Sequence, residues 1–90
     1  MKFNNKKTFE DFIEKFRYIE YSNVEQSRNI QEYLFKNGFR WIEGQTCFLD
    51  YGVKGVFYLY IANKKFRLTI DSEPDKMYLI TYEDLSKAYL

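Results

Sequence analysis

Alternation of apolar and polar residues over positions 56–71 predicts a β-hairpin at the centre of the fold. Two alternating runs, VFYLYIA and KFRLTID, flank Asn63-Lys64, and a connection of two residues is typical of tight hairpins. We therefore expect Ala62 to pair with Lys65. One face is then entirely apolar, with three residues of each strand opposite one another: Phe57, Leu59 and Ile61 opposite Ile70, Leu68 and Phe66. The other face carries Val56, Tyr58 and Tyr60 opposite Asp71, Thr69 and Arg67. The apolar face belongs to the core, since a slip of one residue would expose it.

A first helix is predicted over Phe9–Glu20, with Thr8 as its N-cap. Apolar residues recur there at helical spacing and form one stripe: Phe9, Phe12, Ile13, Phe16 and Ile19. Charged residues, among them Asp11 and Lys15, fill the opposite face. Such a stripe is typical of a helix that packs on a sheet, and an amphipathic helix that binds a partner is the alternative.

A second helix is predicted from the capping-box pattern Ser22-Asn23-Val24-Glu25 to Asn37, with Gly38 ending it. Its apolar stripe consists of Ile30, Tyr33 and Leu34, with Val24 and Phe35 at the edge. Most of the other residues are polar and should face solvent: Gln26, Arg28, Asn29, Gln31, Glu32 and Lys36.

The rest of the chain is predicted to form short strands and one more helix. We expect strands at Phe39–Ile42, Thr46–Tyr51 and Met77–Ile80, with turns at Glu43–Gln45 and Gly52–Gly55. The final helix should begin at Thr81, with Tyr82, Leu85 and Tyr89 on one face. We thus expect residues 1–90 to form one small α+β domain of order ααβββββα, with residues 1–7 frayed. We expect an antiparallel meander sheet of four to five strands, with two N-terminal helices and one C-terminal helix mainly on one face.

Composition and charge exclude several classes of function. The chain has 14 Lys and Arg residues against 13 Asp and Glu residues, and its net charge is +1. This balance argues against a duplex-DNA binder driven by bulk charge and against an acidic nucleic-acid mimic. The single cysteine, Cys47, and the lack of histidine leave no internal disulfide, no multi-cysteine zinc site and no ordinary neutral-pH base. No apolar run approaches the roughly 18 residues of a membrane span, and the N-terminus lacks the apolar segment of a signal peptide. We therefore expect a cytoplasmic protein without membrane contact.

Catalytic and metal-binding chemistry finds little support in the side chains available. The acid–base candidates are all carboxylates at strand ends or in loops, where turn chemistry is the simpler role: Asp50, Asp71, Glu73 and Asp75. Asp71, Glu73 and Asp75 have the spacing of the first ligands of a calcium loop, but Lys76 stands where that loop needs glycine. Cys47 alternates with Leu49, which favours a buried structural thiol. We expect no enzyme activity, no metal and no cofactor.

The aromatic and basic face of the hairpin is the predicted binding site. It should bring together Tyr58, Tyr60, Lys65, Arg67 and Thr69, with Arg40 and Phe48 nearby. Tyr and Arg are typical anchors of protein interfaces. Tyrosine rings beside cations could equally stack bases and bind phosphates of single-stranded nucleic acid or of a nucleotide signal. Two further interpretations stay open, namely cross-strand pairs on a wet sheet face and burial of this face in a homodimer.

The segment Glu32–Glu43, EYLFKNGFRWIE, resembles a group of small phage and prophage accessory proteins. The shared pattern is L-F-x-x-G-F-x-W from a helix into a strand, L-Y-I in the sheet and a closing I-T-x-x-D-L, here Leu34–Trp41, Leu59–Ile61 and Ile80–Leu85. The resemblance implies an early or accessory phage protein that binds and blocks a host or defence component, and it transfers no catalytic residue. Our leading hypothesis is a non-enzymatic protein that binds and modulates or inhibits a bacterial host or defence protein. A binder of single-stranded nucleic acid or of a nucleotide signal is the alternative.

Overall fold

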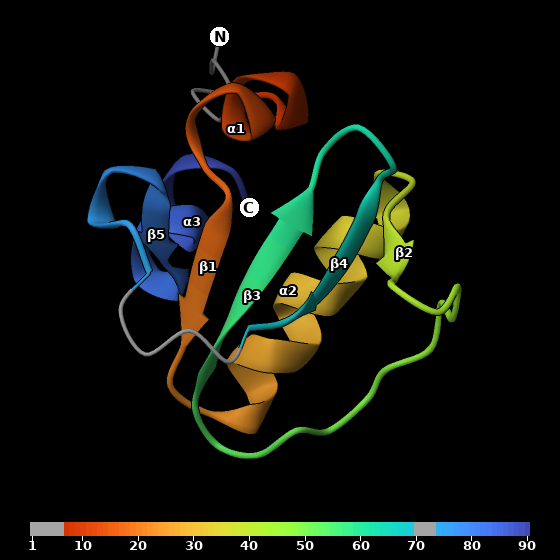
Figure 1. Cartoon of the computed structure of the whole chain (residues 1–90). Helices are drawn as coiled ribbons and strands as arrows, with labels where there is room; N and C mark the ends of the chain where they lie inside the picture. The colour runs from red at the N-terminus through yellow and green to blue at the C-terminus, as the bar shows by residue number, and fades with distance from the viewer. Residues whose placement is uncertain (1–6, 70–73) are drawn as a thin grey trace, which may run out of the picture.

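The computed structural model describes residues 7–69 and 74–90, which form three α-helices, one short 3₁₀-helix and a five-stranded sheet (Figure 1). In chain order the elements are α1 (Phe9–Lys15), β1 (Tyr18–Tyr21), α2 (Val24–Lys36), β2 (Arg40–Trp41), β3 (Gly55–Tyr60), β4 (Lys65–Leu68), the 3₁₀-helix η1 (Lys76–Tyr78), β5 (Leu79–Thr81) and α3 (Tyr82–Ala88). The predicted α+β class is confirmed.

The sheet is mixed rather than an antiparallel meander, with the strand order β2-β4-β3-β1-β5. β3 is antiparallel to its neighbours β1 and β4, whereas β1 is parallel to β5 and β2 is parallel to β4. β3 therefore runs opposite to the other four strands. The predicted antiparallel meander is therefore wrong. The helix α2 connects β1 to β2 and returns the chain along the sheet, so that β2 runs in the same direction as β1.

The first helix is shorter than predicted, because Tyr18–Tyr21 forms the strand β1 instead of the last turn of a helix. α1 ends at Lys15, and Phe16 already has extended backbone angles (φ −121°, ψ 147°). In Tyr18–Tyr21, the side chains of Ile19 and Tyr21 are buried and that of Glu20 is exposed, as in a strand with one face in the core. The apolar spacing thus fits a helix followed by a strand as well as one long helix. Pairing with β3 on one side and β5 on the other favours the strand.

A four-residue turn, Ile61–Lys64, joins β3 to β4 in place of the predicted two-residue turn. The observed pairs are Tyr60 with Lys65, Leu59 with Phe66, Tyr58 with Arg67 and Phe57 with Leu68. The register therefore differs from the predicted one by two residues, and the predicted partners Ile70 and Asp71 lie outside the described residues. Lys64 and not Asn63 has the positive φ, 55°. The described residues of β3 and β4 keep their predicted faces, because side chains alternate with a period of two along a strand and the shift is even.

The starts of the three α-helices and the end of α2 lie at or within one residue of their predicted positions. Thr8 caps α1 and Thr81 caps α3. Gly38, with a φ of 90°, follows the last residue of α2 and its C-cap, as predicted. The N-cap of α2 is Asn23 and not Ser22, since the Asn23 side chain accepts the hydrogen bond from the helix backbone.

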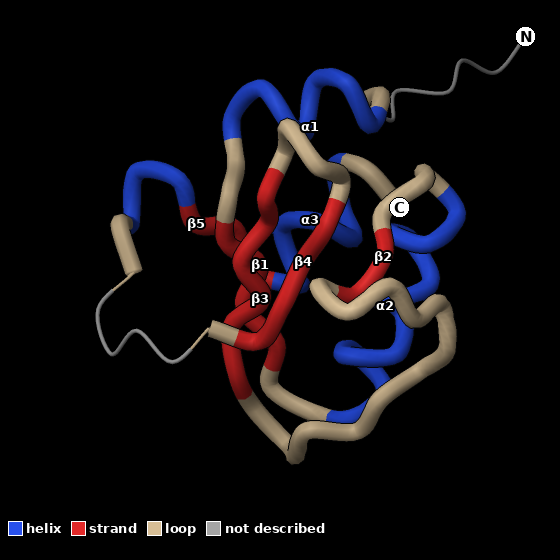
Figure 2. The backbone as a smooth tube through the Cα atoms, turned by 45° about the vertical axis from the view of Figure 1, so that its right-hand side comes forward, coloured by secondary structure: helices blue, strands red, loops and turns tan. Residues whose placement is uncertain are grey.

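Two predicted strands differ from the structure. Thr46–Tyr51 forms no strand, and this part of the chain is a long loop that runs beside α2 (Figure 2). Met77–Ile80 is split, because η1 extends to Tyr78 and β5 covers Leu79–Thr81.

Side-chain hydrogen bonds hold the loop between β2 and β3 where strand pairing was expected. Gln31 is fully buried, so the prediction that it faces solvent is wrong. Its amide donates to the carbonyl of Leu49 (2.8 Å) and accepts from the Leu49 N–H (2.9 Å), which replaces the bonds of a neighbouring strand. The Trp41 indole N–H donates to the carbonyl of Cys47 (3.1 Å). With its backbone held in this loop, Cys47 has an exposed side chain, and the predicted buried thiol is wrong.

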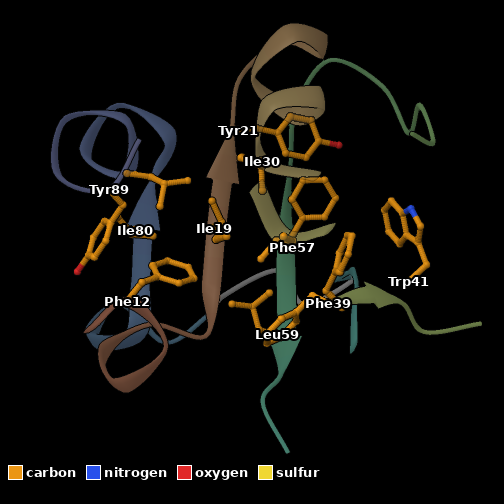
Figure 3. Packing of buried hydrophobic residues seen from close by; sticks show 13 residues of the cluster. Phe12, Ile19, Tyr21, Ile30, Phe39, Trp41, Phe57, Leu59, Ile80 and Tyr89 are labelled. Atoms are coloured by element: carbon orange, nitrogen blue, oxygen red, sulfur yellow. The ribbon is translucent and has the colours of Figure 1, made fainter. Parts of the chain in front are cut away.

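All three α-helices contribute to one core on one face of the sheet (Figure 3). The buried apolar side chains come from the helices and from the inward positions of the strands: Phe12, Ile19, Tyr21, Ile30, Leu34, Phe39, Trp41, Phe57, Leu59, Phe66, Ile80, Leu85 and Tyr89. Figure 1 shows β3 and β4 passing in front of α2. The opposite face of the sheet therefore has no α-helix over it in the described part of the chain.

Candidate binding surface

The uncovered face of the sheet brings together most of the residues that the sequence singles out. The strand register sets Tyr58 opposite Arg67 and Tyr60 opposite Lys65. Arg40 on β2 lies opposite Lys65 in turn. Arg40 and Arg67 are exposed, while Lys65 and both tyrosines are half-buried. All five side chains alternate with core residues along their strands, so they share one face as predicted.

Two other residues lie elsewhere than predicted. Thr69 follows β4, and its N–H donates to the carbonyl of Val56 (2.7 Å). It therefore lies beside Val56 and not opposite Tyr58, as the shift of register requires. Phe48 lies beneath the guanidinium of Arg28 on α2, with 4.1 Å between Arg28 Cζ and the ring centroid, and it is therefore not near this face.

Tyr18 also belongs to the uncovered face, and sequence reasoning missed it because the helical spacing of Phe9–Glu20 conceals β1. It lies opposite Tyr58 across the β1–β3 pair. The centroids of the Tyr18 and Tyr58 rings are 5.0 Å apart, and those of Tyr58 and Tyr60 are 4.8 Å apart and perpendicular. Arg67 Cζ lies 5.9 Å from the centroid of Tyr60. We call Tyr18, Tyr58, Tyr60 and Arg67 the tyrosine row.

A hollow adjoins each end of the tyrosine row. The first, of about 400 Å³, is lined by Tyr18 and Tyr58 of the row together with Arg17, Asp75 and Tyr78. The second, of about 290 Å³, is lined by Arg67 of the row and by the loop after β2, including Ile42, Leu49 and Tyr51. Each hollow shares at least one residue with the row, and the second is also lined by the core-side residues Trp41 and Leu68. We call the row and the two hollows together the binding surface.

Exposed apolar side chains gather at the two ends of the binding surface. Ile42 and Tyr51 at the second hollow are 47% and 51% exposed, and Tyr78 at the first is 43% exposed. Met77, next to Tyr78 in η1, is 77% exposed. Large apolar side chains that are exposed together commonly mark an interaction site, whereas single ones do not.

Charge is unevenly distributed over this face. Arg40, Lys65 and Arg67 are neighbours in the register of β2 and β4 and form a basic corner. Glu20 is exposed on β1, and Asp75 lines the first hollow. A cluster of cations beside aromatic rings attracts carboxylates or phosphates, and the acidic groups at the other side limit attraction to a uniformly anionic ligand.

The carboxylates considered for catalysis have structural roles where the structure describes them. Asp50 accepts a hydrogen bond from the Gly52 N–H (2.9 Å), and Asp75 accepts one from the Met77 N–H (3.0 Å). Asp71 and Glu73, the other members of the calcium-loop spacing, lie outside the described residues. Within residues 7–69 and 74–90, no three His, Cys, Asp or Glu side chains are grouped closely enough to hold a metal ion. The arrangement offers rings, cations and apolar anchors, which are groups for binding.

Comparison of the chain with models of protein families, with curated proteins and with solved structures gave no match in any of the three. Of the helices in the described ranges, none combines the length and the apolar character that crossing a bilayer requires.

Proposed function

We propose that this chain is a non-enzymatic accessory protein of the phage kind, which binds and modulates or inhibits a bacterial host or defence protein through the binding surface. The observation that carries the proposal is the tyrosine row with a hollow at each end, on a sheet face that no described α-helix covers. Tyr and Arg are enriched among the residues that dominate protein–protein affinity. Exposed apolar residues at both ends supply the further anchors that an interface of ordinary size needs.

The packing of the tyrosine rings favours a protein partner over a nucleic acid. The Tyr58 and Tyr60 rings meet edge to face, and the Arg67 guanidinium lies over Tyr60. Part of the π surface that stacked bases would use is therefore already in contact with other side chains. The net charge of +1 also provides little of the general attraction on which binding to a phosphate backbone depends.

A binder of single-stranded nucleic acid or of a nucleotide signal is the second candidate. It is favoured by the position of Tyr18 and Tyr58 on neighbouring inner strands beside the basic corner, since modules that stack bases on a sheet place aromatic residues in this way. Fluorescence titration with oligonucleotides and mononucleotides at two salt concentrations tests it. Affinity that falls steeply with salt would favour this candidate, and flat titrations would dismiss it.

The bacterial cytoplasm is the compartment that we propose, because the resemblance of Leu34–Trp41 and Ile80–Leu85 to phage proteins implies a bacterial host. A homodimer is a related possibility, in which a second copy would occupy the binding surface of the first. Light scattering on the purified protein, with and without a bound partner, distinguishes a dimer from a monomer.

Affinity purification from a bacterial lysate tests the proposed function. We compare the wild type with a surface variant, Tyr58→Ala/Tyr60→Ala/Arg67→Ala, and with a matched control at exposed positions of α1 and α2, Glu14→Ala/Lys15→Ala/Glu25→Ala. The wild type and the control should retain the same bacterial protein, and the surface variant should lose it. Recovery of no protein, or of the same protein by all three chains, would contradict the proposal. Tyr18→Ala should weaken the interaction as well, since Tyr18 packs on Tyr58.

A further inference from the structure

A larger hollow, of about 540 Å³, lies on the helix side of the molecule, away from the tyrosine row. One stripe of α2 and its C-cap forms a wall, because its lining residues are spaced by three and four positions: Asn29, Glu32, Tyr33, Lys36 and Asn37. Lys7 and Phe9 line it at the start of α1, and Tyr82 and Tyr89 line it at the two ends of α3. The volume is within the range of about 300–1,000 Å³ that is usual for small-molecule sites.

Hydrogen bonds orient the polar groups of this hollow so that they act as donors. Asn29 Nδ2 donates to the Tyr82 hydroxyl (2.9 Å), which leaves the phenolic proton of Tyr82 available for another acceptor. Asn37 Nδ2 donates to the carbonyl of Tyr33 (2.8 Å) and so satisfies a carbonyl at the end of α2 that would otherwise repel an anion.

The Tyr33 phenol is a second donor. Burial, together with the smaller effects of Tyr89 and Glu10, raises the pKa of Tyr33 to about 12. The phenol therefore keeps its proton at neutral pH. The Tyr33 ring meets Phe9 edge to face, with 5.4 Å between the centroids, so the same wall of the hollow also offers an aromatic surface.

The charged side chains that line the hollow are two cations and one anion, and the Glu10 carboxylate acts on Tyr33 from nearby. Lys7 and Lys36 are cationic and Glu32 is anionic, and the side chains of all three are exposed at the rim. A ligand that matches this lining carries hydrogen-bond acceptors and negative charge at one end, for the ammonium and phenol groups, and a flat apolar part for the aromatic wall.

We propose that the hollow between α1, α2 and α3 binds a small molecule that combines a flat ring with an oxyanion, such as an aromatic phosphate monoester or an aromatic carboxylate. The oxyanion accepts hydrogen bonds from Tyr82 and Lys36, and the ring packs against Phe9 and Tyr33. This site lies apart from the binding surface on the sheet, and its test does not depend on the proposed function.

Titration of the ¹⁵N-labelled full chain, followed by amide chemical shifts, tests the site. The probes are phenyl phosphate and benzoate, together with inorganic phosphate and benzyl alcohol, which carry only the anion or only the ring. We expect saturable shifts at Asn29, Tyr33 and Tyr82 with phenyl phosphate or benzoate, at concentrations about tenfold below those needed for either half-probe. Absence of saturable shifts with both ring-bearing probes, or equal affinity for the half-probes, would overturn the proposal.

Single substitutions separate the proposed contacts from general effects on the fold. Tyr82→Phe should weaken phenyl phosphate binding about tenfold, since it removes one hydrogen bond to a charged group. Lys36→Gln should weaken binding several-fold, and Glu32→Gln should strengthen it because a repelling carboxylate is lost. Lys54→Gln is the control, since Lys54 lines a different hollow beside Glu20. Equal affinity of the wild type and both weakening variants would overturn the proposal, and the Lys36 and Glu32 side chains are exposed, so these variants retain the core.

Discussion

The side-chain amide of Gln31 pairs with the backbone of Leu49 through two hydrogen bonds, 2.8 and 2.9 Å long. Gln31 Nε2 donates in addition to the Ser27 hydroxyl (3.1 Å), so the buried amide has partners for both of its ends. Through this pairing α2 holds the middle of the loop that leads from β2 to β3. The same loop carries Tyr51 and closes the second hollow of the binding surface, so the pairing links the core to the proposed site.

Gln31→Leu should lower the free energy of unfolding by about 2–4 kcal/mol. The substitution keeps the volume of the side chain but leaves the Leu49 N–H and carbonyl without their partners. The cost for each group is about 1–2 kcal/mol, the lower part of the usual range, because Leu49 is only half-buried. Urea denaturation measures the loss. Glu32→Gln, at the exposed neighbouring position, is the control and should change stability by less than about 0.5 kcal/mol. Equal midpoints for Gln31→Leu and the control would show that the amide pairing contributes nothing.

Gly55→Ala should destabilise the protein by about 1–3 kcal/mol through overpacking. A β-carbon at this position would lie 2.8 Å from the Tyr21 hydroxyl oxygen and 2.9 Å from Leu68 Cδ1. The Tyr21 hydroxyl is buried near Ser27 but makes no well-formed hydrogen bond among the described residues, so Tyr21→Phe alone should be neutral or stabilising.

The double variant Tyr21→Phe/Gly55→Ala identifies the atom responsible. Thermal unfolding should show a smaller cost of Gly55→Ala in the Tyr21→Phe background, since only the contact with Leu68 Cδ1 then remains. The same cost in both backgrounds would mean that the hydroxyl is not the obstacle.

Lys64→Gly should stabilise the hairpin by up to about 1 kcal/mol, because Lys64 holds a positive φ of 55° that glycine adopts without steric cost. Asn63→Gly should destabilise the protein by about 0.5–1 kcal/mol. Asn63 has no positive φ that glycine would relieve, and glycine adds conformational entropy to the unfolded chain. Chemical denaturation of the two variants distinguishes the four-residue turn from the two-residue one. Stabilisation by both substitutions would favour a turn with two positive φ angles, as the sequence predicts.

Stability should fall between pH 10 and pH 12 because of Tyr33. Burial raises the pKa of Tyr33 from 10.0 to about 12. In this range the unfolded chain releases the phenolic proton while the folded chain retains it, so unfolding becomes more favourable as pH rises. The contribution is complete below pH 10 and is lost as pH passes through about 12. Burial also raises the pKa values of Tyr21 and Tyr89, which act in the same direction.

Urea midpoints recorded across this pH range check the effect. Tyr33→Phe should have a shallower pH dependence than the wild type, since one shifted phenol is absent. A dependence of the same steepness in both proteins would assign the effect to other groups. The urea midpoint reports the effect of Tyr33 on stability, and the amide titration reports its contact with a ligand, so the two roles are tested separately.

Local patterns predicted much of the fold and part of the candidate site. The capping residues Thr8 and Thr81 and the glycine after α2 act on backbone groups within a few residues, so their effects are visible in the sequence. The period-two alternation of β3 and β4 placed Tyr58, Tyr60, Lys65 and Arg67 on one face even though the predicted register was wrong. A register shift of two residues leaves each side chain on the same face of the sheet. The predicted faces were therefore correct although the predicted turn was not.

Contacts between distant segments decided what the sequence did not reveal. Tyr18 became part of the tyrosine row because β1 pairs with β3 and β5, whose residues are far away in the chain. No local signal separates a helix that runs to Glu20 from a helix followed by a strand, since the apolar residues fit both periods. The prediction that Gln31 faces solvent failed for a similar reason, because its partner Leu49 lies in a loop that has no regular pattern.

By itself, the sequence determined the class of the fold, the ends of most helices, and a hairpin with one apolar and one aromatic-basic face, because each of these follows from interactions between near neighbours. The tertiary structure alone decided the mixed strand order, the central place of β1, and the hollows that flank the tyrosine row. Strand pairing and burial join residues that are remote in the chain, and their free energy outweighs local helix propensity where the two conflict.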